Sequence, residues 1–161
     1  MGQKSHVVLD GTGDAGVDSL RGKLAEPRKT GYRIIGEYVT APVRTLDRSK
    51  PGAGAWERNI GRAKESPRGL VPAKSLLDAH KSVSTIVPEV AGDFDEFRLH
   101  DTGFGRGGKV IATASLGGKI QVKDQKMYDE FLAKAKDPLT AAQMEADVTE
   151  EDIRQINAAK G

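Results

Sequence analysis

The sequence predicts an α+β protein: a small antiparallel sheet with a Gly-Gly hairpin, packed by C-terminal helices and preceded by a long extended N-terminal arm. Three observations favour this fold class. Strand-like runs flank Gly117-Gly118, apolar residues recur at helical spacing after Asp124, and the first 71 residues are rich in glycine, proline and positive charge. Glycine is costly to order, so a segment of this composition is a poor candidate for a compact domain.

The composition supports a folded part with extended segments attached. The chain has 161 residues, the length of about one domain. Hydrophobic residues make up 37% and aromatic residues 5%, which is little for a chain that folds throughout, yet the formal net charge is only +2. Fully disordered proteins usually combine low hydrophobicity with high net charge, and this chain does not.

The sequence divides into three segments. Residues 1–71 are predicted to be an extended, basic, Gly/Pro-rich arm with one or two short strands. Residues 72–137 are predicted to form a compact α+β core, and residues 138–161 to form acidic C-terminal helices.

Within the arm, residues 6–9 and 32–40 have strand-like composition, with Gly36 a candidate bulge. A weak helix beginning near Val17 is expected to stop at Pro27. Between residues 47 and 69 large apolar side chains nearly vanish. We therefore expect an extended segment there, with no more than a helical turn in it.

The predicted core begins with a short helix opened by Pro72. The β-branched run 83–87 and the residues 94–100 are predicted to be strands. If Gly117-Gly118 are a two-residue turn, Thr113 faces Val122 across the hairpin.

The C-terminal helices are predicted from caps and spacing. Asp124 is a good N-cap, and Met127 and Phe131 follow it on one helical face. Thr140 is expected to cap a short helix, and Thr149 a last one in a capping box. The stripe after Asp124 would cover the apolar face of the hairpin.

Charge is distributed unevenly along the chain. Residues 1–81 carry 15 Lys and Arg against 9 Asp and Glu, whereas residues 82–161 carry 10 against 14. This asymmetry favours an anionic partner for the arm or pairing between copies of the chain, and it also fits two ordinary solvated faces. The candidate partner-binding residues of the arm, with Trp56 and Ile60 as its anchor, are Arg44, Arg48, Lys50, Trp56, Arg58, Ile60, Arg62, Lys64 and Arg68.

Two glycine motifs resemble phosphate-binding loops in spacing only. Gly11, Gly13 and Gly16 have the spacing of a dinucleotide-binding fingerprint, but aspartates flank the glycines and no alternation of strands and helices follows. The loop from Gly103 to Lys109 lacks the Ser or Thr that follows the lysine of a P-loop. We interpret the second loop as a mobile connection or an anion-binding loop that uses Arg106 and Lys109.

Nothing in the sequence assigns a catalytic residue, a metal site or a cofactor. There is no cysteine, and the three histidines have no ligand-like spacing. His100-Asp101 is a candidate proton-handling pair, although a histidine beside an aspartate at a strand end is more often structural. The carboxylates Asp93, Asp95, Glu96 and Asp101 cluster only loosely.

The sequence favours a structural or accessory protein of a large assembly, a bacteriophage-type virion component that staples neighbouring subunits from the capsid or tail. Its partners would be protein subunits of the same assembly. The alternative is a nucleic-acid-binding or ribosome-associated protein that uses the basic arm, and a third interpretation is a small nucleotide-binding enzyme. No signal peptide or membrane span is recognisable, which predicts location in a virion or the cytoplasm.

Overall fold

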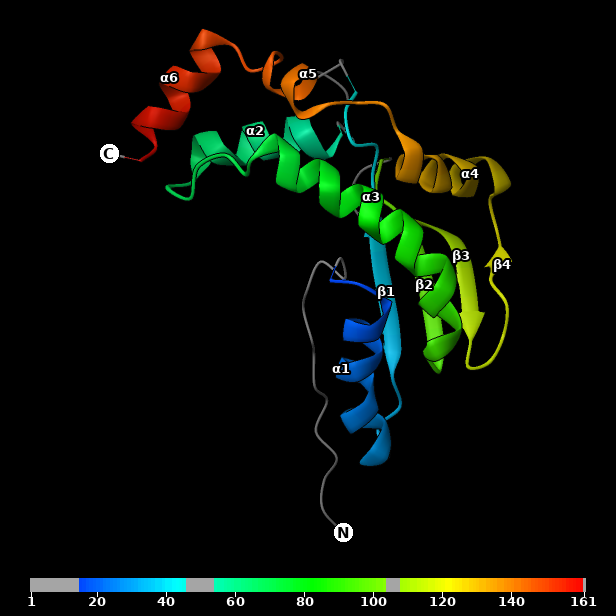
Figure 1. The fold of residues 1–161 in the computed structure, drawn as a ribbon. Helices are drawn as coiled ribbons and strands as arrows, with labels where there is room; N and C mark the ends of the chain where they lie inside the picture. The colour runs from blue at the N-terminus through cyan, green and yellow to red at the C-terminus, as the bar shows by residue number, and fades with distance from the viewer. Residues whose placement is uncertain (1–14, 46–53, 104–107, 161) are drawn as a thin grey trace.

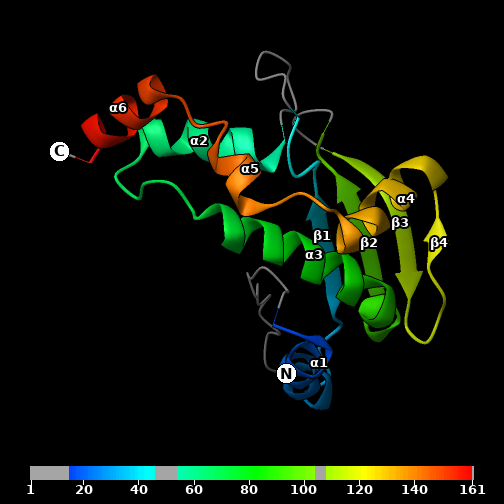
Figure 2. The ribbon, with the colours of Figure 1, turned by 45° about the horizontal axis from the view of Figure 1, so that its top comes forward.

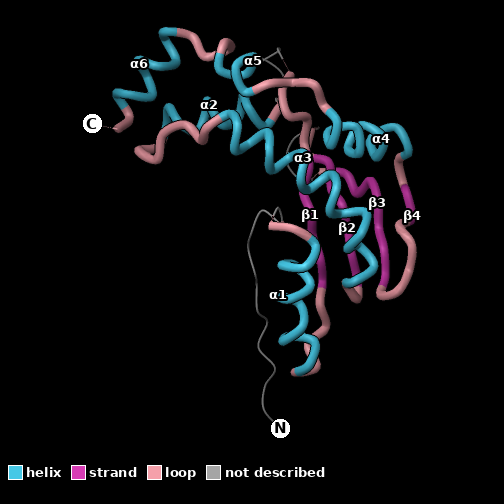
Figure 3. Tube along the Cα trace, in the orientation of Figure 1, coloured by secondary structure: helices cyan, strands magenta, loops and turns pink. Residues whose placement is uncertain are grey.

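The computed structural model describes residues 15–45, 54–103 and 108–160. Within these ranges the chain combines six α-helices with a four-stranded sheet, which confirms the expected mixture of helix and sheet. The strands, in the spatial order β1-β2-β3-β4, are β1 (Ile35–Thr40), β2 (Glu96–Asp101), β3 (Lys109–Ser115) and β4 (Gln121–Val122). β1 and β2 are parallel, and the other pairs are antiparallel. Because β1 comes first in the spatial order, it is an edge strand (Figures 1 and 3).

Two helices cover one face of the sheet, which we call the inner face. The helices are α1 (Val17–Lys29), α2 (Ala55–Glu65), α3 (Ala73–Val90), α4 (Gln125–Ala133), α5 (Ala141–Glu145) and α6 (Glu150–Ala158), with 3₁₀ turns η1 (Ala91–Asp93) and η2 (Lys134–Lys136). α3 and α4 lie over the inner face, and α1 runs beside β1 (Figures 1 and 2). α2, α5 and α6 gather beyond one end of the sheet. No described helix covers the opposite, open face.

The main core lies between the inner face and helices α3 and α4. Phe97 and Leu99 of β2 are fully buried and belong to one cluster with Val87 of α3 and Phe131 of α4. Asp124 caps α4 by accepting a hydrogen bond from the Met127 N–H at 3.1 Å, as the sequence predicts. Burial of these large side chains is what fixes α3 and α4 on the sheet.

Residues 83–87 are part of α3, so the strand expected there is wrong. Ile86 and Val87 bury the apolar face of this helix against the sheet. Ser84 and Thr85 donate their hydroxyl hydrogen bonds to carbonyl groups one turn earlier. β-branched residues are only slightly unfavourable in helices, and burial of the whole face outweighs that preference.

The connection between β3 and β4 is longer than a two-residue turn. β4 begins at Gln121, and the register pairs Thr113 with Gln121 rather than with Val122. Gly117 has a φ of 68° and donates its N–H to the Gly92 carbonyl at 2.9 Å. This contact holds the connection against the turn after α3 and replaces the tight hairpin we expected.

The strand expected at 32–40 is confirmed as β1, which ends before Pro42. α1 continues to Lys29, two residues beyond the proline predicted to stop it. Pro27 lies in the last turn of the helix, where its missing N–H removes a single hydrogen bond, and Glu26 still accepts one from the Thr30 N–H. The strand expected at residues 6–9 lies outside the described residues.

The extended arm expected at 47–69 is wrong for residues 55–65, which form α2. Trp56 and Ile60 are buried in a second hydrophobic cluster with Met144 of α5, and we call it the Trp56 cluster. α6 packs on α2 as well. Both C-terminal helices begin with the predicted threonine caps, each in a capping box. The apolar residues that order α2 therefore come from α3 and from the C-terminal helices.

Candidate functional site: a groove along the edge strand

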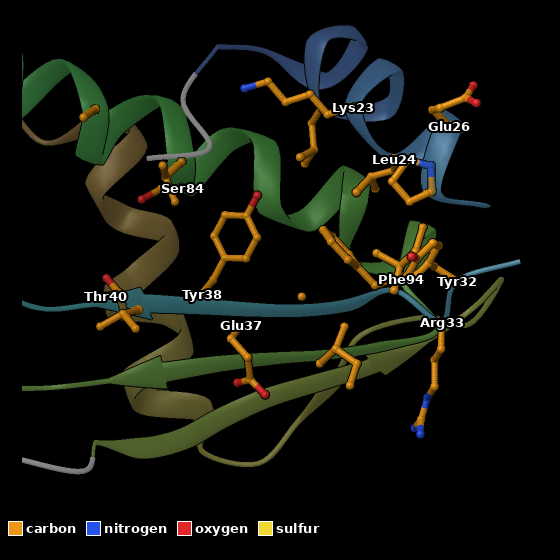
Figure 4. A pocket seen from close by; sticks show the side chains of 18 of the residues that line it. Lys23, Leu24, Glu26, Tyr32, Arg33, Glu37, Tyr38, Thr40, Ser84 and Phe94 are labelled. Atoms are coloured by element: carbon orange, nitrogen blue, oxygen red, sulfur yellow. The ribbon is translucent and has the colours of Figure 1, made fainter. Parts of the chain in front are cut away.

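A cavity of about 720 Å³ lies between α1, β1 and α3 (Figure 4). All residues of β1 line it, and helix α1 contributes the face that carries Leu20, Leu24 and Pro27. α3 contributes His80 and neighbouring residues. We call this cavity the groove. Ligand sites are typically concave, largely apolar and of about this volume.

Ion pairs and one buried leucine hold α1 in place as a wall of the groove. Leu24 is 6% exposed and joins the main core, although the rest of α1 is largely exposed. The Arg21 guanidinium pairs with the Asp93 carboxylate at 2.8 Å, and Arg28 donates to the Asp93 carbonyl. Because only a few contacts attach α1 to the body, space remains between this helix and β1.

The floor of the groove needs a glycine at position 36. A Cβ on Gly36 would lie 2.7 Å from the Phe94 ring, so the ring occupies the space of a side chain. Phe94 in turn makes an edge contact with Tyr38, with ring centroids 6.2 Å apart. The sequence makes Gly36 a candidate bulge, but the register of β1 with β2 is regular at this residue. The glycine instead admits the aromatic ring.

The Tyr38 side chain rises from β1 into the groove (Figure 4). Burial raises the pKa of its phenol, which keeps the hydroxyl protonated at neutral pH. No described residue forms a hydrogen bond with this hydroxyl. A half-buried phenol of this kind is a ready donor and acceptor for a molecule in the groove.

His80 lines the groove from α3. Burial lowers its pKa to about 4, assisted by the positive charges of Lys134 and Arg58. The imidazole is therefore neutral at pH 7 and offers one donor and one acceptor. No described residue forms a hydrogen bond with the ring. Ser84, which also lines the groove, donates its hydroxyl hydrogen bond to the His80 carbonyl at 2.8 Å.

Lys134 contacts β1 at Thr40, one of the residues that line the groove. Its ammonium group donates to Thr40 Oγ1 and to the Ala41 carbonyl, both at 2.5 Å, and lies 5.8 Å from the Phe131 ring centroid. Burial lowers the pKa of Lys134 to about 8, opposed by the nearby Asp101 carboxylate. These contacts join η2 to the end of β1.

The outer edge of β1 has backbone groups with which no described strand pairs. Ile34 and Thr40 accept hydrogen bonds on their carbonyls from the β2 side. Because strand residues alternate in direction, the N–H and C=O groups of Ile35, Glu37 and Val39 point the other way. No described strand pairs with that edge. Ile35 and Val39 are also 50% and 64% exposed at their side chains.

The open face beside this edge carries charges that already have partners. Glu37 accepts a hydrogen bond from Arg98 at 2.7 Å and lies 2.5 Å from His100 Nε2. Arg33 pairs with Glu96 at 2.7 Å. His100 and Asp101 face opposite sides of β2, so they do not form the proton-handling pair considered from the sequence.

The structure does not gather the predicted arm residues into one binding surface. Trp56 and Ile60 are buried inside the chain, so they cannot anchor it to a partner while the Trp56 cluster is intact. Arg44 pairs with Asp147 at 2.7 Å, and Lys64 pairs with Asp152 at 2.5 Å. The basic and acidic halves of the sequence thus pair within one molecule at these positions. Arg58 lies 3.5 Å from the Thr102 hydroxyl, Arg62 and Arg68 are exposed, and Arg48 and Lys50 lie outside the described residues.

The glycine motifs fall largely outside the described residues, which exclude Gly11, Gly13 and Arg106. Lys109 is exposed and pairs with Asp124 at 2.6 Å, and this contact lowers the pKa of the Asp124 carboxyl. The ammonium group of Lys109 is therefore already engaged.

The sequence places Tyr38 in a predicted strand and His80 in a predicted helix but does not bring the two together. The available signal was a glycine between strand residues, followed two positions later by a tyrosine, at the edge of the sheet. That signal becomes informative only when the strand order is known.

The groove offers two neutral hydrogen-bonding side chains, an apolar wall and a strand edge with which no described strand pairs.

Within the described ranges, no three His, Asp or Glu side chains come together as a metal site. None of the helices described is long and apolar enough to cross a membrane. No protein-family model matches the chain, and comparison with curated proteins and with solved structures also gave no match.

Proposed function

We propose that this chain is a non-enzymatic interaction protein of a larger assembly, and that its groove receives a polypeptide segment of another subunit. The observation that carries the proposal is the combination of a groove of about 720 Å³ with a strand edge along its floor that is unpaired among the described residues. Extended chains bind such edges because main-chain hydrogen bonds supply affinity and alternate side chains supply specificity.

A bacteriophage-type virion is the specific assembly we propose, on the sequence-based expectation given above. The structure changes the role assigned to this chain. Residues 55–65 form a helix of its own core, so the groove replaces them as the docking element. The chain then acts as the receiver of an extended segment rather than as its donor.

Nucleic-acid binding stays the alternative, but fewer of the predicted arm's cationic side chains are unpaired than the sequence suggests. Arg44 and Lys64 already neutralise carboxylates of the C-terminal segment. Nonspecific binding to phosphates depends on the number of free cationic side chains, so these pairs weaken that prediction.

The test is the native mass of the particle that contains the chain. We expect the 17.2 kDa chain to purify in a much larger complex. Ala79→Arg, which places a long side chain at the α3 wall of the groove, should release it. Leu116→Arg is the control, because Leu116 is 54% exposed on the β3–β4 connection and away from the groove. A wild-type chain that remains a monomer in its native source would contradict the proposal.

A further inference from the structure

We propose that the occupant of the groove is an extended peptide that adds to β1 as a fifth strand, with apolar side chains at alternate positions and a carboxylate opposite Lys23. This inference rests on the proposed function and specifies the partner and the binding mode. It follows from three properties of the groove: its backbone edge, its apolar cavity and its charges.

The backbone edge sets the binding mode. Ile35, Glu37 and Val39 direct their N–H and C=O groups along the groove at intervals of two residues. A ligand that satisfies donors and acceptors repeated at this spacing must itself repeat every two residues, as a peptide strand does. A compact small molecule in the cavity would leave most of these groups unpaired.

The cavity sets the side-chain pattern. Alternate side chains of an added strand point to the inner face, where Leu24, Val83 and Phe94 form apolar walls between α1 and α3. These side chains would be apolar. Tyr38 and His80 supply the hydrogen-bonding groups deeper in the groove. The remaining side chains would lie on the open face beside Ile35 and Val39.

The charges that line the groove set where the peptide carries a carboxylate. Lys23 extends from α1 over the end of the groove that contains Tyr38 and Thr40 (Figure 4). Its ammonium group has no partner among the described residues. The other charged side chains of the lining are paired: Glu26 with Lys29, Arg33 with Glu96, and Glu37 with Arg98. Lys23 is therefore free to bind a carboxylate, from an acidic side chain or from a chain terminus.

A second copy of the chain, paired through its own β1, fits less well. Antiparallel pairing of two β1 strands about their centre would place two Glu37 carboxylates opposite each other, and like charges directly opposite are destabilising. The carboxylate of β1, Glu37, is already engaged by Arg98 and His100, so it would not serve Lys23 of the other copy. A dimer held by β1 is one outcome of the experiment below.

The experiment selects peptides from a random twelve-residue library on the full chain. We expect selected sequences to share alternating apolar residues and an acidic residue. Methylation of alternate backbone nitrogens should weaken binding by about tenfold or more in the register that faces β1, and should have little effect in the other register. Fluorescence anisotropy of the labelled peptides measures the dissociation constant for each of the two methylation registers. Failure to select any peptide, or equal loss in both registers, would overturn the proposal.

Variants of the protein test the same backbone hydrogen bonds by changing β1 instead of the peptide. Val39→Pro removes an N–H that points away from β2, a position at which an edge strand tolerates proline. Val39→Pro should weaken the binding of the selected peptides about tenfold, whereas Val39→Ala, which keeps the N–H, should leave their binding unchanged. Circular dichroism checks that both variants fold. If Val39→Pro does not fold, the methylated peptides still test strand addition on the wild-type chain.

Lys23 separates the charge contact from the strand contact. Lys23→Glu should abolish the preference for an acidic residue in the selected peptides, and Lys23→Arg should retain it. A wild-type chain that forms dimers lost on Val39→Pro, and that selects no peptide, would replace the proposal by pairing of two copies. If the chain purifies in a large particle whose mass is unchanged by Val39→Pro and by Lys23→Glu, strand addition fails while the proposed function stands.

Discussion

The Trp56 cluster and the groove are both places where apolar side chains surround polar groups, but they differ in how those groups are satisfied. In the Trp56 cluster, the indole Nε1–H donates to the Met144 carbonyl at 2.7 Å, and nearby Lys64 and Asp152 form an ion pair. In the groove, the Tyr38 hydroxyl and the His80 ring have no hydrogen-bond partner among the described residues.

This difference separates structural sites from binding sites within one chain. Fully buried polar groups in folded proteins almost always have partners, and the Trp56 indole follows this rule. The Trp56 cluster joins α2 to α5. The Tyr38 hydroxyl and the His80 ring are only partly buried, and we propose that another molecule supplies their partners.

The largest effect should come from Trp56→Ala. Trp56 is fully buried, and its removal leaves a cavity and takes the indole hydrogen bond from the Met144 carbonyl, which keeps its bond from the Asp147 N–H at 3.1 Å. We expect the free energy of unfolding to fall by about 4 kcal/mol. Chemical denaturation measures it, with Val71→Ala, a 45% exposed position, as the control. A loss below about 1 kcal/mol would show that the Trp56 cluster is not a structural site.

The sequence predicted the main core better than the Trp56 cluster, for a physical reason. Phe97, Phe131 and Leu99 come from segments whose own periodicity indicates strand or helix. Trp56 and Ile60 stand in a segment with too little apolar surface to fold alone, and their partners come from other elements, with Met144 lying 88 residues from Trp56 along the chain. Local composition therefore predicted an arm where a long-range contact makes a helix.

The groove was out of reach of the sequence because it depends on strand order. Tyr38 and His80 lie in elements that the sequence did predict. What places them on one cavity is the position of β1 at the sheet edge and of α1 beside it. A pattern of residues does not contain that information.

His80 should make stability depend on pH. Its folded pKa of about 4 lies below its ordinary value of 6.5. Between these values the unfolded chain binds more protons, so stability falls as the pH drops from 6.5 to 4. The loss should not exceed about 3 kcal/mol. Urea unfolding at several pH values, in wild type and in His80→Gln, measures it. A slope unchanged in His80→Gln would show that other groups cause the dependence.

Removal of the Lys64 side chain should have an intermediate effect. Asp152 is 4% exposed at its side chain and Lys64 is 28% exposed, so Lys64→Ala leaves a buried carboxylate with fewer partners. We expect a loss of about 2 kcal/mol, less than for a fully buried pair. Arg62→Ala on the same helix, exposed and without a described ion pair, should change stability by less than about 0.5 kcal/mol. Equal effects of the two variants would remove the distinction between the α2–α6 contact and the ordinary surface.

The smallest effect should come from Tyr38→Phe, and it tests the groove directly. If the hydroxyl has no partner within the chain, its removal loses no hydrogen bond, and the free energy of unfolding should change by less than about 0.5 kcal/mol. The ring contacts with Phe94 and Phe97 remain, because phenylalanine keeps the same ring. A loss of 1 kcal/mol or more, typical of a broken hydrogen bond, would mean that the hydroxyl is satisfied inside the chain. The groove would then resemble the Trp56 cluster, and only its strand edge would still call for a partner.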